Sequence, residues 1–378
     1  MDFNLNKEQE LLRDGLGKFL ATRYDLEKSR TAAKLGPGWQ PEIWRGLADE
    51  LGILGAAFPE SVGGIGGGPV EIMVIAEELG RALAIEPFID TVVVAGGLLQ
   101  RADHPTSSAL LERIAEGTAI VALASIEPDT GEYAVATTAT RDGDGWVITG
   151  EKIVVAAAPL ATHLLITART SGDPTDPHGI SLFLTEFDPA APPPGLSVHG
   201  YRTIDDRRGA DLTFDGLRLS AEALLTDDAA ASLAQARDEG AAAVCAEAVG
   251  CMRKVLADTV EYSKQRQQFG QPIGTFQVLQ HRMVDMYLEL EQSVAAVYLA
   301  VLNSEAEPQV RARAVSAAKV TIGRAARFIG QNAVQLHGGM GMTEELAIGH
   351  YFKRLTALQY EFGSTDSHRT RYAKLTRP

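Results

Sequence analysis

The stretch GWVITGEKIVV at residues 145–155 decides the fold class, because its apolar residues recur with a period close to two, as in a half-buried β-strand. Four more short runs between residues 119 and 227 are rich in β-forming residues and are bounded by Asp, Gly and Pro clusters: AIVALAS, HLLITART, GISLFLTEF and ADLTFDGLRL. No helical pattern separates these runs. They therefore predict an antiparallel sheet and disfavour a doubly wound fold of alternating strands and helices.

Helical patterns lie on both sides of this β-rich region. Apolar residues recur three and four positions apart in EQELLRDGLGKFL and PVEIMVIAEELGRAL, and long helical patterns return after about residue 228. The sequence predicts three domains: an α-helical domain at 1–118, a β domain at 119–227 and an α-helical domain at 228–378. The glycine run VGGIGGGP at 62–69 is interpreted as a plain flexible connection between helices, because it lacks the spacing and the strand-to-helix setting of a P-loop or dinucleotide fingerprint.

Composition excludes several classes of function. The formal net charge of -14 disfavours nucleic acid or an anionic membrane as the main partner, because no basic surplus exists to neutralise phosphates. The two cysteines, Cys245 and Cys251, exclude a disulfide framework, and no metal-ligand spacing accompanies them. The polar N-terminus and the absence of a long apolar run predict a cytoplasmic protein without a membrane span.

Two stretches carry residues suited to a phosphorylated ligand. The first, RQQFGQPIGTFQ at 266–277, offers an arginine for phosphate, an aromatic stacking face and glutamine amides. A surface arginine and a turn phenylalanine packed in the core explain it equally well. The second, QLHGGMGM at 335–342, has closely spaced glycines whose backbone N–H groups can approach a pyrophosphate. Alone it is a weak signal, since glycine-rich helix ends are common.

Together, and in this order, the two stretches resemble the acyl-CoA dehydrogenase family, and the likeness covers nearly the whole chain. The segments that carry it are LGILGAAFPESVGGIGGG, GDGWVITGEKIVV, SKQRQQFGQPIGTFQVLQHRMVDM and QLHGGMGMTEELAIGHYFKRL. The resemblance implies an α+β, mainly α fold with an N-terminal α-helical domain, a middle antiparallel β-barrel-like domain and a C-terminal four-helix bundle. It also implies assembly as a dimer of dimers.

The resemblance implies FAD as cofactor and an acyl-CoA thioester as substrate, with electrons passing to an electron-transferring flavoprotein. In such proteins the two stretches serve the flavin of the neighbouring subunit. Six residues are, by resemblance, the FAD-binding groups, the first three at the pyrophosphate and adenine and the others nearby: Arg266, Phe269, Gln277, Gln335, Gly338 and Gly339.

Three segments depart from the family where it contacts the flavin ring. The usual Thr-Glu-Pro is Ile-Glu-Pro at 126–128, so the threonine hydroxyl is missing, although Ser125 is adjacent. The usual Gly-Ser-Asp is Gly-Glu-Tyr at 131–133, and the usual Trp-Ile-Thr is Val-Val-Ala at 154–156. The hydroxyl and the aromatic wall are therefore absent at the matching positions.

The two positions at which the family carries its catalytic base have no acid in this sequence. Counted without gaps, the common base position of the family falls on Phe362, and Glu361 is one residue away. One residue turns a helical side chain through about 100°, so Glu361 does not simply inherit the role. A second known position of the base falls on Gly240, next to Glu239.

Glu247 is the candidate base on physical grounds. It is the only charged residue in GAAAVCAEAVGCM at 240–252 and lies two helical turns after Gly240. Isolated there, the carboxylate would be desolvated and its pKa raised towards the value that proton abstraction requires. The alternative is a buried glutamate paired with an arginine or lysine from another helix, such as Arg282.

The sequence lacks the family's residues at the flavin ring but keeps those at the pyrophosphate. In this combination it most resembles the small subunits of pimeloyl-CoA dehydrogenase and of related heteromeric steroid side-chain enzymes. These are α2β2 assemblies with fewer complete flavin sites than chains. We therefore expect α,β-dehydrogenation of an acyl-CoA as one subunit of such an assembly. The alternatives are a self-sufficient homotetramer that uses Glu247, and a non-catalytic subunit that shapes the site of its partner. A flavin-dependent oxidase or monooxygenase ranks lower, because no residue points to it.

Overall fold

The structure is a computed structural model that describes residues 4–102, 104–128 and 134–377. Long helices dominate both ends of the described chain, and the strands of the eight-stranded sheet all lie between Val121 and Thr226. This arrangement confirms the predicted α+β, mainly α fold class. The chain divides into two compact units that each combine distant segments, one with residues 68–84 and 238–377 and the other with residues 85–237. The domain boundaries at 118 and 227 stay predictions, because these units cut across them.

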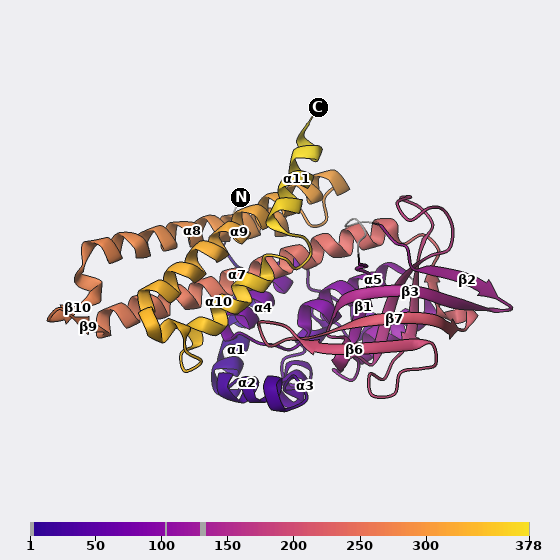
Figure 1. The fold of residues 1–378 in the computed structure, drawn as a ribbon, viewed down its shortest axis with the longest axis horizontal. Coiled ribbons are helices and arrows are strands. Elements are labelled where there is room, and N and C mark those ends of the chain that lie inside the picture. Colours follow the sequence, from indigo (N-terminus) through magenta and orange to yellow (C-terminus); the bar gives the residue numbers. More distant parts are fainter. Residues whose placement is uncertain (1–3, 103, 129–133, 378) are drawn as a thin grey trace. The chain divides into compact units, whose positions relative to one another are not determined.

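The first unit is a helical bundle that also takes in the chain up to Ser29. Helix α7 enters it at Asp238, and a short hairpin joins α7 to α8 (Figure 1). Its elements are α1 (Lys7–Arg23), α4 (Pro69–Ala82), α7 (Ala230–Gln265), β9 (Gln267–Gln268), β10 (Gln271–Pro272), η6 (Ile273–Thr275), α8 (Gln277–Val301), α9 (Pro308–His337), η7 (Gly338–Met342), α10 (Ala347–Leu358) and α11 (Thr365–Thr376).

Glycines let α4 and α7 touch backbone to backbone. A Cβ added to Gly80 would lie 2.1 Å from the carbonyl oxygen of Glu247, and one added to Gly250 would lie 1.9 Å from that of Glu77. The Sγ of Cys251 donates to the Gly80 carbonyl at 3.1 Å. Because no side chain separates the two helices, the crossing fixes the part of α7 that carries Glu247.

The second unit contains the sheet and its flanking helices. It runs from Arg30 to Gly67 and from Ile85 to Arg237, and α2 (Leu26–Leu35) ends inside it. Its helical elements are α3 (Pro41–Asp49), η1 (Ile53–Gly55), η2 (Glu60–Val62), the π-helix η3 (Ile89–Ala95), α5 (Gly96–Ala102), α6 (Pro105–Ala115), η4 (Ala158–Leu160) and η5 (Ala221–Ala223). Its strands are β1 (Val121–Ala124), β2 (Thr138–Asp142), β3 (Gly145–Ala156), β4 (His163–Arg169), β5 (Ile180–Glu186), β6 (Leu196–Arg202), β7 (Arg208–Leu219) and β8 (Leu224–Thr226).

The strand order is β6-β7-β3-β2-β4-β5-β8, and β1 pairs with β4. Most pairs are antiparallel as predicted, but β1 runs parallel to β4, and β2 meets β4 in a single parallel pair. The sheet is therefore mixed. A parallel pair needs a long connection, and β2 and β3 lie between β1 and β4 in the chain.

Strand β3 shows the alternation that the sequence predicts, with Trp146 and Ile148 buried. Two register shifts interrupt its pairing with β7, the second between Lys152 and Val155. The first shift has its extra residue in β7, whereas the second has it in β3 and changes which β3 side chains face the core. As a result Lys152 and Val155 are both buried, although they lie three residues apart.

The glycine run is an ordered connection between η2 and α4. Within the second unit, the N–H of Gly66 donates to Phe58 and the N–H of Gly67 to Ala56, at 2.9 and 2.8 Å. The run connects helices as predicted, but it is hydrogen-bonded within the chain rather than flexible, because its backbone N–H groups donate to carbonyls of the preceding turn.

Candidate functional site

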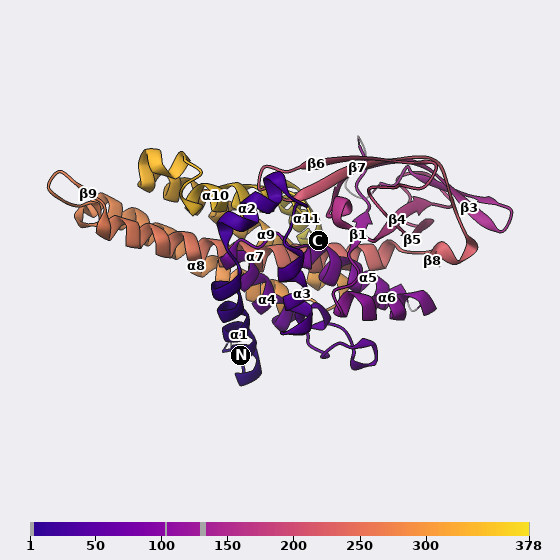
Figure 2. The same cartoon turned by 90° about the horizontal axis from the view of Figure 1, so that it is seen from below.

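The hairpin between α7 and α8 carries the first predicted ligand-binding stretch. Its ends are tied by backbone bonds of 2.8 Å, from the N–H of Arg266 to Tyr262 and from the N–H of Ile273 to Arg266. Phe269 and Gly270 form the tip in the left-handed region, with φ of 54° and 81°. The hairpin lies at the far end of both helices in two perpendicular views (Figures 1 and 2).

The groups on this hairpin face away from the core. The side chain of Phe269 is 92% exposed, which excludes the alternative of a turn phenylalanine packed in the core. Its ring meets Phe276 edge to face, with centroids 6.1 Å apart. Arg266 and Gln277 are also exposed. The hairpin therefore presents a cation, aromatic rings and an amide to the outside of its own chain.

The second stretch follows α9 and lies beside the first. The His337 ring stacks on Tyr262 of α7 with centroids 4.2 Å apart and an interplanar angle of 26°. Tyr262 also donates its hydroxyl hydrogen to the His337 carbonyl at 3.4 Å. Gln335 is exposed, so both predicted stretches present polar groups at one end of the bundle.

The glycines of the second stretch leave the backbone open. Gly338 adopts φ +60°, and a Cβ built on Gly338 or Gly339 would meet no atom within 4 Å. The N–H of Gly338 itself donates to the Gln335 carbonyl at the end of α9. The uncovered glycine backbone beside an exposed arginine and an aromatic ring leaves room for the pyrophosphate and base of a nucleotide. The six predicted residues thus fit the cofactor that the sequence implies. Their contacts with it stay a prediction.

Glu247 is fully buried and is held by Arg354 of α10. The guanidinium donates from Nε to Oε1 and from Nη2 to Oε2 of Glu247, both at 2.8 Å. Arg354, rather than Arg282, is the partner from another helix. A bidentate guanidinium favours the charged carboxylate and occupies both of its oxygens. This geometry suits a structural ion pair better than a carboxylate waiting for a substrate proton.

Arg354 also holds Glu361, which follows α10. Its Nη1 donates to Oε1 of Glu361 at 2.5 Å, and its Nη2 donates to Oε2 at 3.1 Å. The buried Lys319 donates from Nζ to the carbonyls of Leu358 and Glu361, at 2.9 and 2.7 Å. Two acids and two backbone carbonyls are therefore fixed by two buried cations. We call the segment at 358–363, which these groups hold, the clamped turn.

The clamped turn places Phe362 over Gly240. A Cβ added to Gly240 would lie 2.6 to 2.9 Å from three atoms of the Phe362 ring. Phe362 has φ +54°, and its carbonyl accepts a 2.9 Å hydrogen bond from Nε2 of His368. Burial lowers the pKa of His368 to about 4, so the ring is neutral and Nε2 carries the hydrogen. The two positions that the resemblance assigns to a base are occupied by a glycine and by the ring that covers it.

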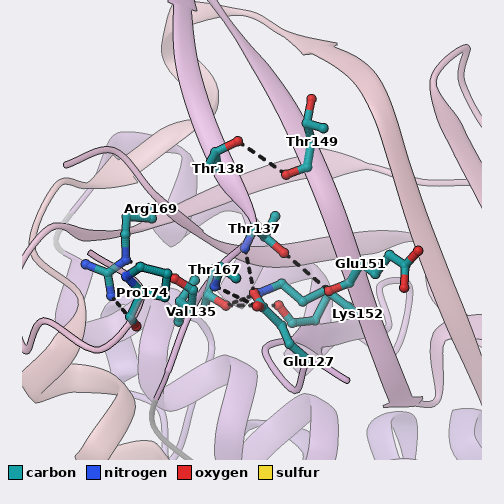
Figure 3. A network of polar contacts seen from close by, with 12 residues as sticks. Glu127, Val135, Thr137, Thr138, Thr149, Glu151, Lys152, Thr167, Arg169 and Pro174 are labelled. Atoms are coloured by element: carbon teal, nitrogen blue, oxygen red, sulfur yellow. Dashed lines mark hydrogen bonds and ion pairs between the residues drawn. The ribbon is translucent and has the colours of Figure 1, made fainter. Parts of the chain in front are cut away.

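The ring-contact positions lie in the second unit, around a buried ion pair. Lys152 donates to Oε1 of Glu127 at 2.5 Å and to the Thr167 hydroxyl at 2.9 Å (Figure 3). Backbone N–H groups of Ala136 and Thr137 donate to the same carboxylate at 2.6 and 3.1 Å. Burial alone would raise the pKa of Glu127, but Lys152 and these N–H groups outweigh burial and lower it.

Two apolar residues flank this ion pair at the surface. Ile126 and Val154 are each 52% exposed, and the N–H of Ile153 donates to the Ile126 carbonyl at 2.8 Å. Val154 has φ +52°, a strained value for a β-branched residue, and its N–H donates to Oδ1 of Asp211 at 2.9 Å. At positions 126 and 154 themselves, the side chains offer neither the hydroxyl nor the aromatic ring that the family has there. The third departure, at 131–133, lies outside the described residues.

Sequence reasoning missed three of the groups that organise these sites. Arg354, Lys319 and Asp211 each hold a residue that is far away in sequence, and only the pair of Arg354 with Glu361 is local. Arg354 lies in GHYFKRLTAL, where two adjacent basic residues predict an exposed position. Its buried position follows only from the packing of α10.

Neither metal nor membrane features accompany the candidate site. Among the described residues, no group of three or more His, Cys, Asp or Glu side chains is placed to hold a metal ion. In the same part of the chain, no helix is long and apolar enough to cross a membrane.

Comparison with family models matches three consecutive parts of the chain. The models described as the N-terminal, middle and C-terminal domains of acyl-CoA dehydrogenase match residues 6–118, 122–217 and 231–375. Acyl-CoA dehydrogenase IpdE2 of Mycolicibacterium smegmatis is 30% identical over 352 residues, which cover 93% of this chain and 93% of the relative. The short-chain-specific acyl-CoA dehydrogenase of Megasphaera elsdenii is 29% identical and covers 97% of both chains.

Two similar solved structures each carry the names of two proteins. A variant of the Tcur3481–Tcur3483 steroid ACAD is 29% identical, with a TM-score of 0.87 over 98% of this chain and 97% of that one. The ChsE4–ChsE5 complex from Mycobacterium tuberculosis is 25% identical, with a TM-score of 0.89 over the full length of both chains.

Proposed function

Because the chain belongs to the acyl-CoA dehydrogenase family, we propose that it acts as one subunit of a heteromeric, FAD-dependent acyl-CoA dehydrogenase. The reaction is the α,β-dehydrogenation of an acyl-CoA thioester. FAD, when bound, supplies the redox chemistry by accepting the hydride from Cβ. The electrons then pass to an electron-transferring flavoprotein. The likeness to the small subunit of pimeloyl-CoA dehydrogenase stays a prediction within this proposal.

The observation that carries the proposal is the closed base position. The Phe362 ring fills the space above Gly240, so neither of these positions offers a proton acceptor. Two of the acids beside them, Glu247 and Glu361, both bind Arg354. The third, Glu239, is one residue from Gly240 on α7, so its side chain points about 100° away from that position. A general base must reach the proton that it removes. We infer that the base comes from a partner chain.

The exposed hairpin also supports a site that is shared between this chain and a partner chain. Arg266, Phe269 and Gln277 extend from the end of the bundle and leave their polar and aromatic groups free for a second molecule. In the second unit, Ile126 and Val154 replace the ring contacts with aliphatic side chains. This chain therefore supplies groups for the phosphates and adenine, and the partner supplies the surroundings of the ring.

The names of two similar structures also support a heteromer. The Tcur3481–Tcur3483 steroid ACAD and the ChsE4–ChsE5 complex each carry the names of two different proteins. The self-sufficient homotetramer with Glu247 as base is the alternative. It requires Arg354 to release a carboxylate that it now holds through two hydrogen bonds.

The first test is the FAD content of the chain purified alone and of its complex with a homologous dehydrogenase subunit. We expect little flavin in the folded chain alone, and flavin in the complex that bleaches when acyl-CoA is added. About one flavin per chain in the isolated protein, bleached by the thioester, would support the homotetramer instead.

A variant of the hairpin tests the FAD-binding groups directly. Arg266→Ala should lower the flavin content of the complex, because it removes the cation expected at the pyrophosphate. The control is Arg253→Ala, which removes another arginine of the same stretch of chain, one that pairs with Glu77 in the bundle. Equal flavin content in both variants would contradict the assignment of the hairpin.

The catalytic alternatives separate in a second variant. Glu247→Gln in the assembled complex should leave turnover within about threefold of the unmodified complex if the base belongs to the partner. A loss of about a hundredfold or more with the fold intact would make Glu247 the base.

A further inference from the structure

A second buried glutamate lies in the other unit and has no part in the proposed function. Glu86 follows α4 and comes three residues before the π-helix η3. Every residue from Leu83 to Ile89 is buried, and Glu86 is the only charged one among them. A carboxyl group in such a segment needs a polar partner. π-Helical turns often occur at functional sites.

Glu86 contacts Gln40, which is equally buried. The backbone N–H of Gln40 donates to Oε1 of Glu86 at 3.1 Å, and the two side chains are 4% and 2% exposed. Gln40 precedes α3 without using its side chain as a cap. Within the described residues, the second carboxyl oxygen of Glu86 and the amide nitrogen of Gln40 have no hydrogen-bond partner. Buried polar atoms are rarely left in this state, so each one calls for an explanation, such as a bound water or a polar group of a ligand.

The two orphan atoms have complementary chemistry. One is an oxygen that accepts a hydrogen, and the other is an NH₂ group that donates one. A hydroxyl group has the chemistry to satisfy both kinds of atom, because its hydrogen can go to a carboxyl oxygen and its oxygen can accept from an amide NH₂ group. Burial raises the pKa of Glu86 to about 7, against the opposing effects of backbone N–H groups and the charge of Arg207. Both protonation states of Glu86 are therefore accessible near neutral pH. A hydroxyl group can form a hydrogen bond with the carboxylate as well as with the protonated carboxyl group.

We propose that Glu86 and Gln40 form a buried binding site for one hydroxyl group on an otherwise apolar ligand. The apolar run on both sides of Glu86 excludes a charged ligand from this position. Within the proposed function, on which this step rests, the ligand is an acyl group that carries a hydroxyl. Water offers the same hydroxyl chemistry, so the experiment must separate the two sources.

The first experiment tests binding without turnover. The full chain alone is mixed with 1-hexanol or, as a control, with 1-chlorohexane, and infrared difference spectra are recorded below pH 6. The C=O stretch of protonated Glu86 is assigned by its absence in Glu86→Gln. We expect 1-hexanol to shift this band and 1-chlorohexane to leave it unchanged. A band that moves with neither compound but responds to ¹⁸O-labelled water would leave only structural water at the site and overturn the proposal.

The second experiment measures specificity in the FAD-loaded complex. Two acyl-CoA thioesters of equal length, one with a terminal hydroxyl and one with a methyl end, are compared by kcat/KM. We expect the hydroxylated thioester to be preferred about tenfold or more, because a thioester without the hydroxyl leaves the buried polar groups of Glu86 and Gln40 unpaired. Glu86→Leu and Gln40→Leu should abolish this preference. Glu78→Gln, which alters another buried glutamate in α4, should keep it.

The two experiments separate the proposals. If neither thioester is oxidised, the proposed function fails, and the infrared result still decides whether the hydroxyl site exists. If both thioesters are oxidised equally well by the unmodified complex, the proposed function stands and the acyl-hydroxyl site is overturned.

Discussion

Two buried glutamates show how much of a residue's environment can be predicted from its neighbours in the sequence. Glu247 and Glu86 are each the only charged residue in an apolar run, and both are buried as such a pattern predicts. Their partners differ. Glu247 meets a guanidinium from a helix that begins a hundred positions later in the chain, whereas Glu86 meets an amide and keeps one oxygen unbonded. Burial could be predicted from the local sequence, but the partner could not, because it depends on helix packing.

At this scale, Arg354 should be among the most sensitive positions of the bundle. Arg354→Met leaves Glu247 buried without its cation, so we expect a loss of about 3–5 kcal/mol in the free energy of unfolding. Chemical denaturation measures it. The control is Arg324→Met, whose exposed ion pair with Glu289 should contribute no more than about 1 kcal/mol. Equal losses in the two variants would contradict the role given to Arg354.

Glu86 should make stability depend on pH. Its pKa is raised from 4.5 to about 7 in the folded chain, so the folded state binds more protons than the unfolded state between these values. Stability therefore falls as pH rises through this window, by up to about 3 kcal/mol. Glu86→Gln removes this contribution.

The measurement is a series of denaturation curves for both proteins between pH 5 and pH 8. The difference in unfolding free energy between Glu86→Gln and the unmodified chain should grow in favour of the variant as pH rises, and level off above about pH 7. A difference that stays constant across this range would contradict the raised pKa.

Among the elements, β3 was predicted as a strand but not with its bulges. The alternation of GWVITGEKIVV indicates a strand, and the structure has one at Gly145–Ala156. An inserted residue leaves no mark in the apolar pattern, because the residues on both sides stay apolar. The left-handed conformation of Val154 was therefore invisible, as was the role of Asp211 in holding it.

The strain at Val154 predicts an unusual response to glycine. Val154→Gly should stabilise the chain by about 1 kcal/mol, because glycine adopts φ +52° without strain and little buried surface is lost. Val155→Gly is the matched control and should destabilise by about 2 kcal/mol or more, because that side chain is buried. Thermal unfolding of both variants measures the contrast. Destabilisation of similar size in both would show that the conformation of Val154 carries no strain.

For the whole molecule, the order of helical and β segments was predictable, but the order of strands was not. The segment order follows from the change in apolar period along the chain. The strand order β6-β7-β3-β2-β4-β5-β8 depends on pairing between segments such as β3 and β7, about sixty residues apart. No local pattern specifies such pairs. The parallel entry of β1 was missed for the same reason.

The assembly of the molecule should involve the outer face of α8. Met286, Leu290 and Val297 are buried on one face of this helix, against the bundle. A second apolar stripe is exposed along the other face, at heptad-like spacing: Val284, Leu288, Ala295, Leu299 and Leu302. Exposed apolar stripes of this length mark protein interfaces.

Leu288→Glu should therefore weaken assembly. A charge in an apolar interface raises the dissociation constant by about tenfold or more, which sedimentation velocity detects. Leu11→Glu, at an exposed leucine of α1, is the control and should leave the assembly unchanged. If the two variants sediment alike, the stripe on α8 is not part of the interface.

The fit of Phe362 over Gly240 has a consequence for substitutions at either position. An acid restored at position 240 would collide with the ring, because even its Cβ would lie within 2.9 Å of three ring atoms. An acid restored at position 362 would leave a void above the glycine. Either substitution alone is therefore disfavoured while the other residue of the pair remains unchanged. An acid at either position would therefore need two coordinated changes, one at Gly240 and one at Phe362, before its side chain had room to act as a base.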